Sequence, residues 1–186
     1  MRSFLPVFVL SVALAAPHSA DAGLLFQSVL LGENERPVPV ETDALGSAVM
    51  VVNPDTFQFD LTMFVVGITI DDLVESEAGR FHIHIGGPEE AGGVIFQFAG
   101  LDDFWETTLD GVLLKREIKG AQFGQEFMDD YWDDLLAGNT YLNLHTQAYP
   151  AGEIRGQLVL IPEPASLMIV GVGGLLLLRR PRRPVA

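Results

Sequence analysis

The sequence contains no cysteine, few basic residues in its central part and only four histidines. The absence of cysteine excludes disulfide bonds and thiol chemistry, so the fold must rest on its hydrophobic core. Residues 23–161 contain 23 acidic and 6 basic residues, which gives a net charge of −17. Because such an acidic surface repels nucleic acid and anionic lipid, we expect no nucleic-acid partner.

Long apolar runs occur only at the two ends of the chain. Residues 1–22 combine a basic residue at Arg2, an apolar run and the small-x-small triplet at positions 20–22. This is the pattern of a secretory signal peptide, which we expect to be cleaved before Gly23.

The C-terminal segment, residues 162–186, has three parts. Pro162, Glu163 and Pro164 are followed by an uncharged apolar run and then by four arginines. The run covers residues 165–178, and as a helix it would span only about 21 Å, against about 30 Å for the hydrocarbon core of a bilayer. The arginines are expected to stay in the cytoplasm, which places residues 23–161 on the far side of the membrane.

Residues 23–161 are long enough for one domain. Alternation of apolar and polar residues, clearest over 57–65, predicts seven to nine short strands, whereas 125–136 has helical spacing and is followed by Gly138 as a cap. We therefore predict an all-β fold, an antiparallel β-sandwich or flattened Greek-key barrel with one short helix, flanked by the signal peptide and a C-terminal hydrophobic helix. The other predicted strands are 24–31, 46–52, 80–86, 94–98, one or two within 107–118, 141–146 and 153–161.

Every histidine outside the predicted signal peptide lies in one of two predicted strands. In the first strand His82 and His84 share the face opposite to Phe81, Ile83 and Ile85, and in the second His145 shares a face with Asn143. Neutral imidazoles bind copper and zinc well, so the three histidines are a candidate three-nitrogen metal site. The alternative is structural: the imidazoles hydrogen-bond one another, Asn143, Thr146 or loop carbonyls and hold the two strands together.

Glu153 and Arg155 form a second candidate set. They lie on one face of the last predicted strand, opposite Ile154. They are either a partner-binding pair or a structural charge pair or ladder contact. We expect four residues to surround the histidines: Asn143, Thr146, Glu153 and Arg155.

Four blocks of the sequence are distinctive: 31–39 (LGENERPVP), 81–86 (FHIHIG), 137–146 (AGNTYLNLHT) and 149–158 (YPAGEIRGQL). Together they resemble the CHRD domain family, a family named from chordin and also found in exported bacterial proteins. The resemblance extends over residues 24–160 and implies an exported module without an assigned activity, so we expect a non-enzymatic binding or structural protein.

The C-terminal segment resembles a PEP-CTERM sorting signal in its Pro162-Glu163-Pro164 motif, its apolar run and its arginine-rich end. That resemblance implies recognition by an exosortase, removal of the tail and delivery to the cell surface or an extracellular polysaccharide matrix. Extracellular polysaccharide and envelope proteins are then the expected partners, and the membrane is contacted only before processing. A permanent C-terminal anchor is the alternative.

The His-x-His strand and the later histidine also resemble the copper site of copper-zinc superoxide dismutase. No histidine follows in the loop 86–93 to bridge two metals, so dismutase activity is not implied. The sequence also has no nucleophile elbow, no H-E-x-x-H motif and no phosphate-binding glycine loop. We therefore expect no enzymatic activity.

Overall fold

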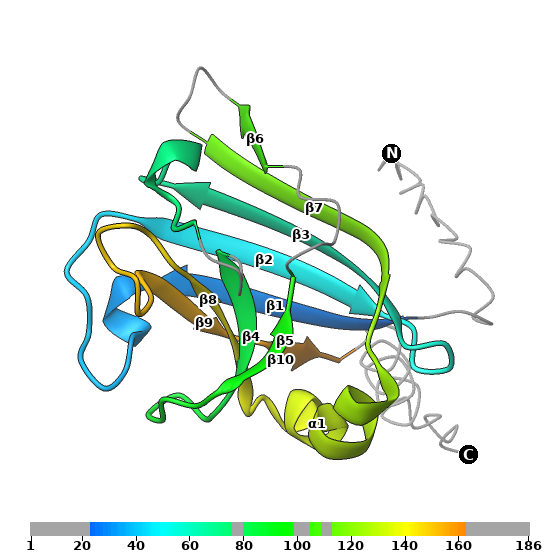
Figure 1. Cartoon of the computed structure of the whole chain (residues 1–186). Helices are drawn as coiled ribbons and strands as arrows, with labels where there is room; N and C mark the ends of the chain where they lie inside the picture. The colour runs from blue at the N-terminus through cyan, green and yellow to red at the C-terminus, as the bar shows by residue number, and fades with distance from the viewer. Residues whose placement is uncertain (1–22, 76–79, 99–104, 109–112, 163–186) are drawn as a thin grey trace, which may run out of the picture.

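The computed structural model describes residues 23–75, 80–98, 105–108 and 113–162, which form ten strands, one α-helix and two short 3-10 turns (Figure 1). The strands are β1 (Leu24–Leu31), β2 (Leu45–Val52), β3 (Gln58–Val66), β4 (Phe81–Ile85), β5 (Val94–Gln97), β6 (Trp105–Thr108), β7 (Leu113–Gln122), β8 (Thr140–Leu144), β9 (Ile154–Gln157) and β10 (Val159–Ile161); the helix is α1 (Gln125–Ala137), and the turns are η1 (Gly32–Asn34) and η2 (Ile70–Asp72).

All strands pair antiparallel in one sheet of order β5-β4-β8-β9-β1-β2-β3-β7-β6, with β10 beside β1. The sheet curls, and Figure 1 shows β4 and β5 in front of β1, β2 and β3. Across the interior, the rings of Phe59 in β3 and Phe96 in β5 lie 5.6 Å apart. One curled sheet therefore encloses the core in a sandwich-like arrangement.

The strands follow the alternation of the sequence. In β2 and β3 every second side chain is buried, including Met50, Leu61 and Met63, and the residues between them face solvent. Because successive side chains of a strand point to opposite faces, this pattern gives each strand one core face and one outer face.

Helix α1 packs across one end of the sheet through aromatic side chains. The ring of Phe123, just before the helix, stacks on Phe59 at 4.4 Å and on Phe127 of α1 at 4.2 Å. Gly138 ends the helix in the left-handed conformation, with φ of 76°, which glycine adopts without a Cβ penalty. The predicted helix and its glycine cap are confirmed.

The prediction of an antiparallel all-β fold with one short helix is also confirmed. The single strand predicted over 153–161 is wrong, because the chain changes partner at Leu158: β9 pairs with β8, whereas β10 pairs with β1. The buried Leu158 lies between them and donates its N–H to the carbonyl of Thr140.

The predicted signal peptide, residues 1–22, and the tail beyond Pro162 lie outside the described residues. Within the described part of the chain, no helix is both long enough and apolar enough to cross a membrane.

Strands β4 and β8 differ from β2 and β3 because they are buried on both faces. One face joins the core, and the other carries polar side chains that are almost fully buried. This outer face is covered by the segment 32–44 and by the loops after β4 and β8. The loop after β4 is fixed by Gln157, whose side-chain amide donates to the carbonyl of Gly86, and by Arg155, which donates to the carbonyl of Gly87.

Candidate metal centre

The three histidines converge on the covered outer face of β4 and β8. His82 and His84 lie opposite Asn143 and Tyr141 of β8, and His145 directly follows that strand. One ring nitrogen from each histidine lies within 4.8 Å of those of the other two, and all three side chains are buried. The predicted convergence of two strands on one cluster is therefore present.

The hydrogen bonds of two histidines fix their tautomers. Nδ1 of His84 lies 3.0 Å from the carbonyl oxygen of Gly92, and Nδ1 of His145 lies 3.1 Å from that of Pro150. A carbonyl oxygen only accepts hydrogen bonds, so each Nδ1 carries the proton and each Nε2 presents a lone pair. Backbone carbonyls commonly hold metal-binding histidines in this way.

The Nε2 lone pairs of His84 and His145 differ in their partners. Nε2 of His84 is buried and has no hydrogen-bond partner. Nε2 of His145 lies 3.1 Å from Nδ1 of His82, and because the His145 nitrogen is unprotonated, His82 donates in this pair. Nε2 of His84 is thus ready to bind a cation, whereas Nε2 of His145 and Nδ1 of His82 become available when His82 changes tautomer and their hydrogen bond is broken.

The electrostatics of the cluster favour neutral imidazoles. Burial, with His82 close by, lowers the pKa of His145 to about 4, and burial also lowers the pKa of His84. Neutral imidazole is the form that binds a metal ion, so His84 and His145 are in the correct protonation state at neutral pH. Zinc or copper at about 2.0–2.1 Å from each nitrogen would place the nitrogens about 3.4 Å apart. They lie within 4.8 Å of one another, so the rings would have to move closer together to close the site.

The aromatic ring of Tyr141 separates the cluster from a buried cation. It stacks on His84 with ring centroids 4.9 Å apart, and the Arg155 guanidinium lies 3.4 Å from its centroid. The Tyr141 hydroxyl accepts a hydrogen bond from the N–H of Gly92, the residue whose carbonyl holds His84. Tyr141 therefore ties together the histidine strand, the glycine-rich loop and β9.

Thr146 and Glu153, two of the residues predicted around the histidines, form a separate network. The hydroxyl of Thr146 donates to Oε2 of Glu153 at 2.6 Å, and the hydroxyl of Thr42 donates to Oε1 at 2.7 Å. Glu153 thereby fixes the covering segment 32–44 to the loop after β8.

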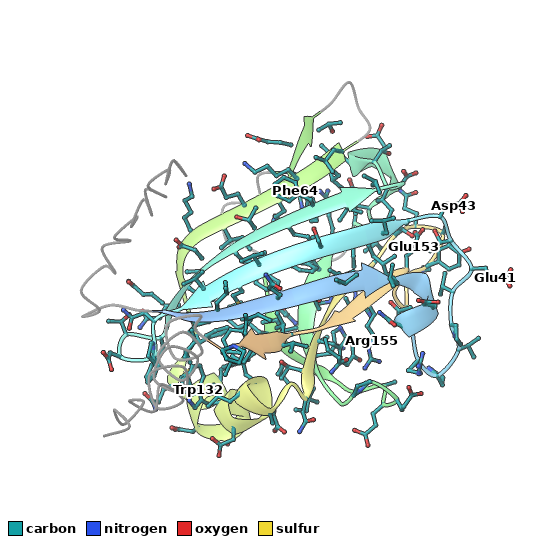
Figure 2. All side chains as sticks on the ribbon, turned by 180° about the vertical axis from the view of Figure 1, so that it is seen from behind. Glu41, Asp43, Phe64, Trp132, Glu153 and Arg155 are labelled. Atoms are coloured by element: carbon teal, nitrogen blue, oxygen red, sulfur yellow. The ribbon has the colours of Figure 1, made fainter. Side chains whose placement is uncertain are left out.

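Glu153 and Arg155 do not pair with each other, so the predicted charge pair is corrected. Glu153 bonds to the two threonine hydroxyls, whereas Arg155 donates to the carbonyl of Gly87 and to the side-chain oxygen of Gln157. In Figure 2 Glu153 lies beside Asp43 and Glu41, and Arg155 lies below β1. Side chains two apart on a strand share a face, but here each one reaches a different covering segment.

Glu35 is a buried residue of this layer that the sequence did not predict. Its Oε2 accepts a hydrogen bond of 3.4 Å from the amide of Asn143, and its Oε1 has no partner. Burial raises the pKa of Glu35 to about 7, although the nearby Arg155 and the Asn143 hydrogen bond oppose the shift. Glu35 lies in an irregular segment with no periodicity, so no sequence pattern marked it.

Comparison with known protein families identifies a match. A family model described as the CHRD domain matches residues 26–158. No curated protein and no solved structure matches the chain.

Proposed function

Because the chain belongs to the CHRD domain family, which is typical of extracellular proteins, we propose that it is an exported, non-enzymatic binding module with a metal centre at its three histidines. The preset tautomers of His84 and His145 carry this proposal. Each Nδ1–H is held by a backbone carbonyl, which leaves the Nε2 lone pairs inside the cluster.

Copper and zinc are the ions that this ligand set fits. Three imidazoles without a cysteine suit either ion, and carboxylate-preferring ions such as calcium and magnesium would lack oxygen ligands. Among the described residues no carboxylate joins the group of potential ligands. A purely structural role, in which the His82–His145 hydrogen bond links β4 to the end of β8, is the competing function.

Metal analysis of protein purified without a polyhistidine tag tests this choice. We expect about one copper or zinc ion per chain and a melting temperature that rises when the ion is added to the apo protein. His84→Gln should weaken metal binding by more than about 100-fold. Loss of a residue that only orients a ligand costs about 10- to 100-fold, and this substitution removes a ligand itself.

Tyr141→Phe is the matched control. It keeps the ring that stacks on His84 and removes only the hydroxyl, so it disturbs the same layer without removing a ligand nitrogen. Equal losses of metal in both variants would contradict a site made by the imidazoles. A wild-type protein with no metal and no copper- or zinc-dependent stabilisation would favour the structural role.

The delivery route rests on the two ends of the sequence. The signal-peptide pattern over 1–22 and the Pro162-Glu163-Pro164 segment support export followed by exosortase sorting to the envelope or an extracellular polysaccharide matrix. Fractionation of cells that produce the full chain, or a chain ending at Pro162, tests this. The truncated protein should be released in soluble form, and retention of both in the membrane would contradict the sorting role of the tail.

A further inference from the structure

A pocket of about 400 Å³ lies on the outer side of β1, β9 and β10, beyond the histidine cluster. Arg155 and Gln157 of β9 belong to its polar part, and β1, the end of η1, the segment after η1 and the loop after β4 supply further polar residues. The volume is within the range of small-molecule sites. Figure 2 shows this region below β1, where Arg155 is labelled.

Arg155 is an unusual residue to find in the wall of a pocket, because it is only 1% exposed. A buried guanidinium is normally paired with a carboxylate. Within the described part of the chain the ion pairs are Arg36–Glu89, Lys115–Glu117 and Lys119–Glu117, and Arg155 takes part in none of them. Its charge is therefore buried without a bonded counter-ion.

The guanidinium also retains unused donors. Nη2 donates to the carbonyl of Gly87 at 2.7 Å and to the side-chain oxygen of Gln157 at 3.1 Å. No described residue accepts from Nε or Nη1. The stack on Tyr141 fixes the plane of the group. A rigid cation with unsatisfied N–H groups is preorganised to bind an anion.

The remaining charges near the pocket do not satisfy Arg155. Arg36 and Glu89, which also line the pocket, neutralise each other through two hydrogen bonds of 3.0 Å. Glu35 influences Arg155 through space, but its carboxyl bonds to Asn143. An incoming anion would therefore be the first direct acceptor for the free donors.

Apolar side chains form one wall of the pocket, beside the neutral polar residues Gln27, Ser28 and Asn34. Val29 and Val159 are 61% and 49% exposed, and Pro88 and Ile161 complete this wall. An inorganic anion would leave these side chains in contact with water, whereas an organic anion would cover them. The lining thus combines one buried cation, an apolar wall and a few neutral polar side chains.

From this arrangement we propose that the pocket binds a small organic carboxylate, with its carboxylate on Arg155 and its hydrocarbon part over Val29 and Val159. This site is separate from the histidine cluster and does not depend on a bound metal. The guanidinium selects the carboxylate by charge-assisted hydrogen bonds, and the valines select an attached apolar group.

Titration of the protein with 4-methylpentanoate, followed by calorimetry and by amide chemical shifts, tests the proposal. We expect binding at least about tenfold tighter than that of 4-methylpentan-1-ol, which lacks the charge, and of acetate, which lacks the hydrocarbon. The largest shifts should fall on β9, β10 and the loop after β4. Equal binding of acid and alcohol, or of inorganic phosphate and the acid, would overturn the assignment.

A matched pair of variants locates the site without disturbing the buried arginine. Val159→Glu places a carboxylate in the pocket wall and should reduce affinity by about tenfold or more through like-charge repulsion. Val49→Glu adds the same charge at a valine of similar exposure, 41%, that does not line the pocket. It lies two strands from Val159, about 10 Å away, and should change affinity by less than about twofold at 0.15 M salt. Equal effects of the two substitutions, or no measurable binding to the wild type, would refute the proposed site.

Discussion

Replacement of Glu35 by glutamine tests the physics of the buried polar layer. The Glu35 side chain is 4% exposed, one of its oxygens has no partner, and the other accepts a long hydrogen bond from Asn143. Burial raises its pKa from 4.5 to about 7. The folded protein therefore holds a proton that the unfolded chain has already released, throughout the interval between these two values.

The size and sign of the effect follow from this difference. A shift of this size corresponds to about 3 kcal/mol, at roughly 1.4 kcal/mol for each pH unit. Because the folded state binds the extra proton, Glu35 contributes its full stability below pH 4.5 and loses it as the pH rises to about 7. The free energy of unfolding should therefore fall by up to about 3 kcal/mol over this range because of Glu35 alone.

Urea unfolding between pH 5 and 8, in the presence of a chelator, measures the effect. Glu35→Gln should remove this pH dependence and make the protein more stable than the wild type at pH 8. The histidines act in the opposite direction, because burial lowers the pKa values of His84 and His145, but their contribution cancels in the difference between the two proteins. Glu41→Gln, at an exposed position of the same segment, should have no effect. Parallel pH curves for wild type and Glu35→Gln would refute the reasoning.

Two further predictions concern glycines. Gly156→Ala should lower the unfolding free energy by about 3 kcal/mol or more, because its Cβ would lie 2.3 Å from the carbonyl oxygen of Val29. Gly93→Ala is the control, because a Cβ at this position would have no atom within 4 Å. Gly138→Ala should cost about 1 kcal/mol because φ is 76° there, and Gly138→Asn should cost less; equal urea midpoints for the two would contradict a conformational cause.

The strands and the histidine cluster could be predicted because they depend on local alternation. His82 and His84 are two residues apart in an extended segment, so they must share a face, and the core position of Ile83 fixes which face that is. His145 follows the strand that pairs directly with β4. The prediction of convergence needed only that these two segments be neighbours.

The covering segments could not be predicted in the same way. Glu35 reaches Asn143, which is 108 residues away in sequence, and Arg155 reaches Gly87 across 68 residues. Both contacts depend on how irregular loops fold over the sheet, and such loops carry no periodic signal. The same reason explains why the sequence could not decide between the alternatives for Glu153 and Arg155. It placed both on one face but did not show the partners that lie above each of them.

The overall charge gives the two candidate sites opposite long-range electrostatics. A field from a net charge of −17 over residues 23–161 attracts a metal cation to the histidine cluster and repels a carboxylate from the Arg155 pocket. Salt screens this field over about 10 Å at 0.1 M but has little effect on contacts with a buried guanidinium. Higher ionic strength should therefore weaken metal binding and strengthen carboxylate binding. The two sites lie on either side of the Tyr141 ring. Because their ligands carry opposite charges, the sign of the salt dependence shows which of the two neighbouring sites is occupied.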